Sequence, residues 1–353
     1  VTVSVLYWFI LRVFIRLMSV PVAPTTSRPF EDVALDSASE VRTFEGTGPD
    51  GHNVVVHRWG DGSDLPGLTI VDGALRDAEC AAWLHAAHTD GPGFTDATLP
   101  WYQNRNLDWR EKIFRRNTRA VVRADESMQS ALWRAVAPFV PDVIDNDYGY
   151  GTWDLHSPND AWRFYRYELR RDDTDGASTD CFPPHHDSTT VKQRNFASWL
   201  TILVYVGAEG AFAGGGTAFF SNNRCPGTSP SADGTATDGA KPVAVVAPRV
   251  GRVVLFHHTG MHRLLHAGCQ LHALDDDSKA DDDARPTVAA KTVLRSDVMY
   301  TLRDGTASIP LRPTPPFDQL EDSDDETVRA CPVFGWTMPP RMPIQPPTAS
   351  AGS

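Results

Sequence analysis

The sequence is poor in cysteine, and none of its cysteines form a CxxC pair. The five are Cys80, Cys181, Cys225, Cys269 and Cys331. An odd, widely spaced set gives neither a disulfide framework nor a cysteine zinc site. We therefore expect a reducing compartment and favour the cytoplasm.

The sequence also lacks an uninterrupted apolar run of membrane-spanning length. Residues 1–11 are strongly apolar, but Arg12 and Arg16 break the run before the roughly 20 residues that a membrane helix needs. Two interpretations stay open. The segment is a signal anchor that directs the chain to the endoplasmic reticulum, or residues 1–17 are not part of the protein and translation begins at Met18. We favour the second, so no membrane partner is expected.

Positive charge is the third deficit, because 33 Lys and Arg face 45 Asp and Glu, for a net charge of -12. A non-specific nucleic-acid binder needs a basic face, so we expect no nucleic-acid partner and attribute the acidity to solubility. The 41% hydrophobic and 10% aromatic residues are typical of a globular protein with a buried core.

The chain divides into three parts by composition. Residues 1–50 are predicted to be a flexible or mis-annotated lead, 51–300 a folded domain, and 301–353 a tail rich in proline and acidic residues. Three polar segments, 170–180, 221–241 and 274–284, interrupt the domain and are interpreted as solvated loop insertions.

Periodicity predicts two supporting helices and a series of short strands. One helix is expected over 78–88 and a second after the N-cap Asp125, ending before Pro138. Strands are expected over 54–57, 67–71, 162–167, 199–206, 217–220, 243–246, 252–256 and 291–295. Many short strands with Gly and Pro turns indicate a mainly β fold of the jelly-roll or sandwich type, with flanking helices (α+β).

Two histidines and one carboxylate form the strongest candidate site. His185 and Asp187 lie two residues apart, so on a strand they share a face while His186 points away. His266 lies in a Leu-His-Ala-Gly context further along the chain. Two His and one carboxylate that leave part of a metal open are typical of non-haem Fe(II) oxygenases.

Further motifs follow this triplet in a fixed order. Phe212-Ala-Gly-Gly-Gly-Thr217-Ala-Phe precedes Gly251-Arg-Val-Val-Leu-Phe, and His266 is followed by Lys291-Thr-Val-Leu-Arg-Ser-Asp-Val-Met-Tyr. In this ordered set the chain resembles the iron(II)/2-oxoglutarate-dependent dioxygenases, in the prolyl 4-hydroxylase-like branch. The resemblance covers about residues 68–300 and implies a double-stranded β-helix, with the catalytic jelly roll over 160–300.

The resemblance implies roles for named residues. His185, Asp187 and His266 look like the iron ligands, and Lys291 looks like the cation for the distal carboxylate of 2-oxoglutarate. Tyr167 and Thr217 stand where family members offer hydroxyls to that carboxylate. A core aromatic and an ordinary strand threonine are the alternatives for these two. Arg295 shares a strand face with Lys291 and is an alternative cation or a structural residue.

The implied activity is hydroxylation of an unactivated C–H bond with Fe(II), 2-oxoglutarate and O2, with release of succinate and CO2. Ascorbate is allowed as a further cofactor. The branch suggests a peptidyl proline, and so a peptide or protein partner. Lysine or a small molecule is an alternative substrate. A non-catalytic jelly-roll binding protein and a zinc hydrolase are alternative classes. The acidic segment that separates His266 from Lys291 is long for the family.

Overall fold

A computed structural model defines the fold. It describes nine segments: 41–47, 53–97, 117–145, 151–170, 180–210, 212–221, 241–260, 262–273 and 288–303. The three predicted loop insertions lie largely outside these segments, as do the start of the chain and residues 304–353.

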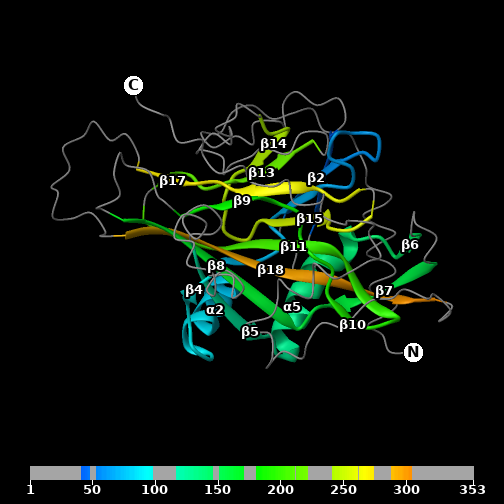
Figure 1. Cartoon of the computed structure of the whole chain (residues 1–353), viewed down its shortest axis with the longest axis horizontal. Coiled ribbons are helices and arrows are strands. Elements are labelled where there is room, and N and C mark those ends of the chain that lie inside the picture. The colour runs from blue at the N-terminus through cyan, green and yellow to red at the C-terminus, as the bar shows by residue number, and fades with distance from the viewer. Residues whose placement is uncertain are drawn as a thin grey trace, which may run out of the picture.

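Eight strands form two facing antiparallel sheets (Figure 1). The strands are β8 (Ala161–Arg170), β9 (Phe182–His185), β11 (Phe196–Glu209), β13 (Thr217–Phe220), β14 (Ala244–Val246), β15 (Val253–His257), β16 (Leu265–Gly268) and β18 (Val288–Leu302). The order β15-β11-β18-β8 forms the centre of the large sheet, and β14-β13-β16-β9 forms the small sheet. Along the chain the eight strands alternate between the two sheets, except that β13 and β14 both lie in the small sheet. The fold is therefore the expected double-stranded β-helix, or jelly roll.

Further strands extend the large sheet beyond this centre. On one side lie β1 (Val41–Thr47), β2 (Asn53–Trp59) and β3 (Thr69–Asp72), and on the other β4 (Thr95–Asp96) and β5 (Thr118–Arg123). The remaining pairings involve β6 (Val143–Asp145), β7 (Thr152–Pro158), β10 (Val191–Gln193), β12 (Ala213–Gly214) and β17 (Leu271–His272).

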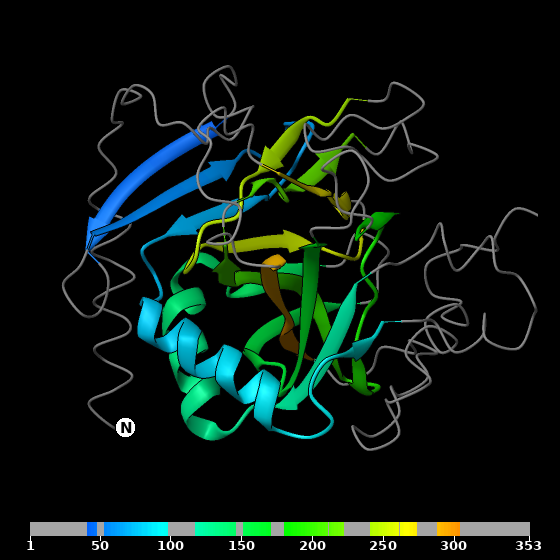
Figure 2. The ribbon, with the colours of Figure 1, turned by 90° about the vertical axis from the view of Figure 1, so that its left-hand side faces the viewer.

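Two α-helices cover the outer face of the large sheet. Helix α2 (Asp77–Thr89) and helix α5 (Glu126–Val136) confirm the two predicted helices; the 3-10 turn η1 (Ala137–Phe139) follows α5. The Asp125 carboxylate caps α5 by accepting a hydrogen bond from the Met128 backbone N–H, 2.8 Å away. The helices lie side by side in Figure 2, and Arg134 of α5 pairs with Glu79 of α2.

Successive side chains of β11 point into two different layers of the core. Ile202, Val204 and Val206 pack towards the helices, whereas Leu203 and Tyr205 pack between the two sheets. Because alternate side chains of a strand face opposite sides, Thr201 falls on the inner side with Leu203. The inner side is therefore where strand positions can contribute polar groups to a site.

Two strands extend past the predicted bounds of the folded domain. Strand β1 lies inside the predicted flexible lead over 1–50, where Phe44 packs against the helix-side core and β2 pairs along its whole length. Strand β18 likewise continues through Leu302, into the predicted tail. Strand β1 is ordered by pairing with the next strand, β2, and the end of β18 by pairing with β7 and β11; local composition does not report such pairing.

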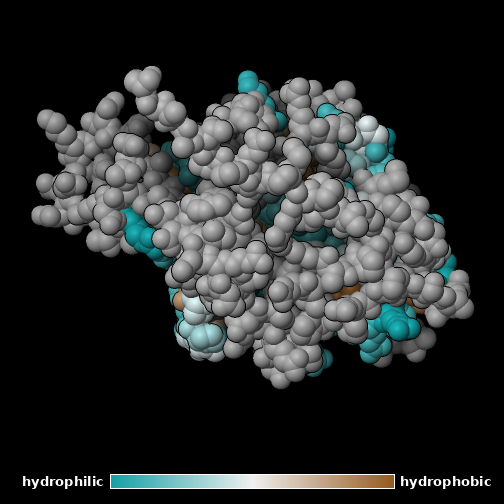
Figure 3. All heavy atoms as spheres, in the orientation of Figure 1, coloured by the Kyte–Doolittle hydropathy of each residue, from teal (hydrophilic) through white to brown (hydrophobic). Residues whose placement is uncertain are grey.

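The surface is largely hydrophilic where its residues are described. Few hydrophobic atoms are visible among the coloured spheres of Figure 3, and Val143 is the one exposed large hydrophobic residue within the described segments. Among these segments, no helix has the length and apolar character to cross a membrane. Residues 1–17, on which the two interpretations of the N-terminal segment depend, lie outside the described segments.

Candidate metal and 2-oxoglutarate site

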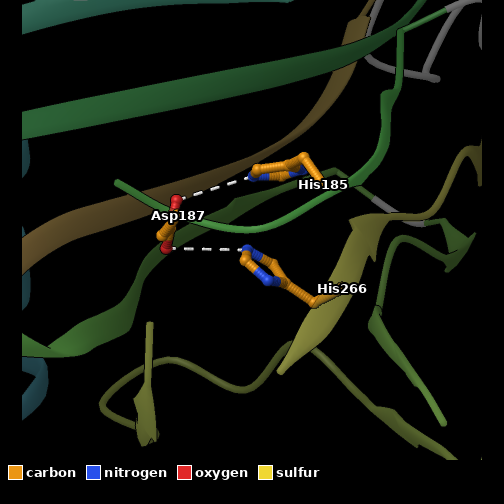
Figure 4. A group of neighbouring side chains, drawn as sticks. All are labelled: His185, Asp187 and His266. Atoms are coloured by element: carbon orange, nitrogen blue, oxygen red, sulfur yellow. Dashed lines mark ion pairs between the residues drawn. The ribbon is translucent and has the colours of Figure 1, made fainter. Parts of the chain in front are cut away.

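Three side chains meet between the small sheet and the loop that follows β9. His185 closes β9 and pairs in register with His266 of the neighbouring strand β16. His185 Nε2 lies 3.6 Å from Asp187 Oδ1, and His266 Nε2 lies 3.6 Å from Asp187 Oδ2 (Figure 4). The candidate ligand atoms all lie within 4.8 Å of one another. Two atoms that bind one ion at about 2.1 Å stand roughly 3 to 4 Å apart, so the 3.6 Å spacings of Asp187 to the two imidazoles are those of a group that could hold one metal ion.

The strand argument for choosing His185 over His186 needs a correction. Strand β9 ends at His185, so Asp187 reaches the group from the following loop rather than from an alternate strand position. The pairing between His185 and His266 brings the two imidazoles together instead. His186 does not belong to the metal-binding group in the described part of the chain.

The protonation states of this group suit metal binding. Burial alone would raise the pKa of Asp187, but the charges of Arg295, His266 and His185 hold that pKa well below its ordinary value. Burial, aided by His185, lowers the pKa of His266 to about 3. Because metal ligands must be a neutral imidazole or an ionised carboxylate, both residues are in the form that binds a cation at neutral pH.

A pocket between the sheets joins the three residues to Lys291. It encloses about 400 Å³ of empty space, its open mouth included. Tyr167, Thr217, Lys291 and Arg295 also line it, along with apolar side chains such as Leu203 and Val293. Asp187 is the one carboxylate among the described lining residues. A zinc hydrolase needs a general base beside its metal, so this lining disfavours that alternative.

Lys291 is a buried cation, only 1% exposed, whose described neighbours carry no carboxylate. Its Nζ donates a hydrogen bond to the Gly215 carbonyl and lies 4.2 Å from the centre of the Tyr167 ring. Burial lowers the pKa of Lys291 to about 8. A buried ammonium group is costly without an anion, so the pocket fits an acidic ligand that reaches Lys291.

Beside Lys291 the two sheets approach each other closely, at Tyr167 of the large sheet and Gly268 of the small sheet. Tyr167 lies opposite Lys291 in the pairing of β8 with β18 and lines the pocket; its role toward a ligand carboxylate stays a prediction. A Cβ atom at Gly268 would stand 2.9 Å from the Tyr167 hydroxyl and 3.3 Å from Phe182. Steric space for Tyr167 is therefore a physical reason for the glycine of the Leu-His-Ala-Gly motif.

The Thr217 hydroxyl already has a protein partner. Its Oγ1 lies 2.7 Å from the Tyr205 hydroxyl, which also lies within hydrogen-bonding distance of the Val246 carbonyl, at 3.0 Å. When Tyr205 donates its single proton to Val246, Thr217 must donate to Tyr205. Thr217 lines the pocket, and its role toward a ligand carboxylate stays a prediction.

Arg295 contacts a candidate metal ligand. It shares the inner face of β18 with Lys291, as predicted, but its Nε lies 3.2 Å from Asp187 Oδ2 and its Nη2 lies 3.4 Å from Asp297 Oδ1. Its charge is therefore largely balanced by two buried carboxylates. Of the two cations, Lys291 is the one positioned for an additional anion.

Sequence reasoning missed two residues behind Asp187. The Thr201 hydroxyl donates to Asp187 Oδ2 at 2.8 Å and lies 3.0 Å from His258 Nδ1. A polar Thr201 within the apolar run 199–206 was the available signal, because a buried strand hydroxyl needs a partner. His258 stood in a cluster of histidines and carried no distinguishing signal.

Comparisons with known proteins found similarity to solved structures only at low sequence identity and low TM-score. No protein-family model matches the sequence, and no curated protein sequence matches it either. One similar solved structure is a viral collagen prolyl hydroxylase from Paramecium bursaria Chlorella virus-1 in complex with 2-oxoglutarate. It is 13% identical, covers 69% of this chain and 98% of its own, and has a TM-score of 0.36. Another is the non-haem α-ketoglutarate-dependent epimerase SnoN of nogalamycin biosynthesis. It is 14% identical, covers 70% and 90% of the two chains, and has a TM-score of 0.33.

Proposed function

We propose that this protein is an Fe(II)- and 2-oxoglutarate-dependent oxygenase that hydroxylates an unactivated C–H bond. One observation carries the proposal: a buried lysine with no described carboxylate partner lines the same pocket as a His-Asp-His group. Taken alone, neither a His-Asp-His metal site nor a buried lysine indicates one particular function. Together, in one pocket, they match a ligand with a metal-binding end and a distal carboxylate.

The chain's own residues would hold both components. His185, Asp187 and His266 would bind Fe(II), and two neutral imidazoles with one carboxylate leave a net positive charge that attracts an acidic ligand. Iron so bound supplies the activation of O2 and of 2-oxoglutarate. Three protein ligands leave further coordination positions open for these co-substrates.

Lys291 and the apolar lining would orient 2-oxoglutarate. The Lys291 ammonium would pair with the distal carboxylate, and the Tyr167 ring limits where that ammonium can lie. Leu203 and Val293 line the space between the two ends of the pocket. Apolar walls reduce the access of water, which strengthens the charge pair. The overall reaction consumes one O2 and converts 2-oxoglutarate into succinate and CO2 while one oxygen atom enters the substrate.

For the substrate we propose a peptidyl proline in a protein or peptide partner. The ordered motifs from Phe182 to Tyr300, which resemble the prolyl 4-hydroxylase-like branch, support this choice. The test is incubation with proline-rich peptide libraries, with mass spectrometry to detect the gain of one oxygen atom. Oxygen on lysine, or on a free small molecule, would redirect the substrate assignment and leave the chemistry intact.

Succinate formation from 2-oxoglutarate without substrate tests the chemistry itself. We expect slow, Fe(II)-dependent turnover, assayed with and without ascorbate. His185→Ala should abolish it and Lys291→Met should reduce it at limiting 2-oxoglutarate, whereas His186→Ala, which alters the adjacent residue outside the group, should retain it. A wild-type protein that neither binds Fe(II) nor forms succinate would instead be the non-catalytic binding protein.

A further inference from the structure

A chain of buried polar side chains runs away from the pocket behind Asp187. Thr201 and Ser198 of β11 are fully buried, and His258, which follows β15, is 3% exposed. His258 Nδ1 lies 3.0 Å from Thr201 Oγ1, and His258 Nε2 lies 3.0 Å from Ser198 Oγ. None of the three lines the pocket, so they touch neither a metal nor a ligand held there.

Counting donors gives the direction of the first two hydrogen bonds. The Thr201 hydroxyl donates its single proton to Asp187 Oδ2, because a carboxylate oxygen accepts. Thr201 Oγ1 must then accept from His258, whose Nδ1 carries a hydrogen. This holds whether the imidazole is neutral or charged, because Nδ1 is a donor in both cases.

The rest of the chain continues in the same direction. When the imidazole is neutral and Nδ1 carries its hydrogen, Nε2 of His258 accepts from the Ser198 hydroxyl, 3.0 Å away. The Ser198 oxygen in turn accepts from the Thr190 backbone N–H at 2.8 Å. Every donor in the series, from Thr190 to Thr201, is therefore oriented toward Asp187.

We propose that Thr201 and His258 are positioning residues that fix the Asp187 carboxylate for metal binding. The Thr201 hydroxyl donates a hydrogen bond to Oδ2, and the Arg295 guanidinium forms an ion pair with the same oxygen, its Nε 3.2 Å away. With Oδ2 held, the carboxylate cannot rotate about its Cβ–Cγ bond, and Oδ1 stays near His185. Since Asp187 follows β9 in a loop, this restraint replaces the one that a strand would give. The inference rests on the proposed function, because it requires a metal at this group.

Binding of Co(II) to the full chain, followed by absorbance, is the test, because it reads the site without turnover. Thr201→Val keeps the shape of the side chain and removes the donor. We expect it to weaken Co(II) binding by about 10- to 100-fold, the usual effect of removing a hydrogen bond to a metal ligand. We expect Thr201→Ser, which keeps a hydroxyl, to bind Co(II) like the wild type.

Thr292→Val is the matched control. Thr292 is a buried strand threonine on β18 whose hydroxyl has no hydrogen-bond partner in the described structure, and it does not line the pocket. Its replacement should leave Co(II) affinity and the absorption bands unchanged. Equal losses in Thr201→Val and Thr292→Val would mean a general packing effect and would overturn the proposal.

His258→Phe supplies the second variant and a double-mutant cycle. Alone it should weaken Co(II) binding, and in a Thr201→Val background it should have little further effect, because His258 acts only through Thr201. Additive losses, or wild-type affinity in either single variant, would overturn the inference and leave the proposed function standing. A wild type that binds no Co(II) would overturn both.

Discussion

At the scale of single residues, burial of the charged Lys291 side chain carries a large free-energy cost. A fully buried ammonium loses its hydration, and the hydrogen bond to Gly215 and the Tyr167 ring replace only part of it. Its lowered pKa of about 8 reports that cost. Such a group is retained where a ligand supplies the missing charge, as the proposed function requires.

Replacing Lys291 separates ligand binding from metal binding. Lys291→Met should weaken 2-oxoglutarate binding by about 10- to 150-fold, since a charged hydrogen bond contributes roughly 1.5–3 kcal/mol. Co(II) affinity should be unchanged, because Lys291 is no member of the metal group. Isothermal titration of 2-oxoglutarate into the Co(II)-loaded protein measures the first and absorbance the second. Undiminished 2-oxoglutarate affinity would transfer the role of cation to Arg295.

The sequence predicts the candidate metal ligands better than it predicts the residues that contact them. His185, Asp187 and His266 were recognisable because few side chains bind metals and their motifs have a fixed order. The partners of Asp187 were not recognisable, since Thr201 and His258 are brought to it by strands separated along the chain. A hydroxyl in an apolar strand indicates only that a partner exists.

At the scale of elements, the approach of β8 to β16 shapes the ligand pocket. Tyr167 comes from the large sheet and Gly268 from the small sheet, and there is no room between them for a methyl group. Lys291 lies over the same ring. A shift of Tyr167 would therefore displace the cation.

Gly268→Ala tests this coupling. The new methyl group would push the Tyr167 hydroxyl aside, and we expect weaker 2-oxoglutarate binding at unchanged Co(II) affinity, measured by the same two titrations. Gly46→Ala is the control, since Gly46 also lies in a strand and a Cβ there meets nothing within 4 Å. If Gly268→Ala bound 2-oxoglutarate normally, Tyr167 would be an ordinary core aromatic.

The elements differ in how well the sequence predicts them. Helix α5 has a local cap at Asp125 and an apolar stripe, and strand β13 matches its predicted range, because these patterns are short and self-contained. Strands β1, β5 and β7 were not predicted. Their residues mix polar and apolar types, and they are ordered by pairing with β2, β8 and β18.

At the scale of the whole molecule, the buried lysine links stability to pH. The ordinary pKa of lysine is 10.5, whereas folding lowers that of Lys291 to about 8. Between these values the unfolded chain binds more protons at this residue, so its contribution to the free energy of unfolding rises with pH. Below pH 8 the full penalty applies, about 3 kcal/mol for a shift of this size.

Comparison of wild type with Lys291→Met isolates this contribution. The ligand-free variant should be the more stable protein near pH 7, and its advantage should shrink by about 3 kcal/mol between pH 8 and pH 10.5. Urea unfolding at a series of pH values measures the difference. A constant difference across that range would mean that Lys291 is not buried as a cation.

The register between β9 and β16 means that a bound ion would also stabilise the fold. Because His185 and His266 face each other across adjacent strands, an ion bound by both would close a long covalent loop that includes β11, β13 and β15. Loop closure of this kind removes freedom from the unfolded chain, much as a disulfide does. Because the cysteines show no evident disulfide framework, the bound metal would serve as a cross-link in this protein.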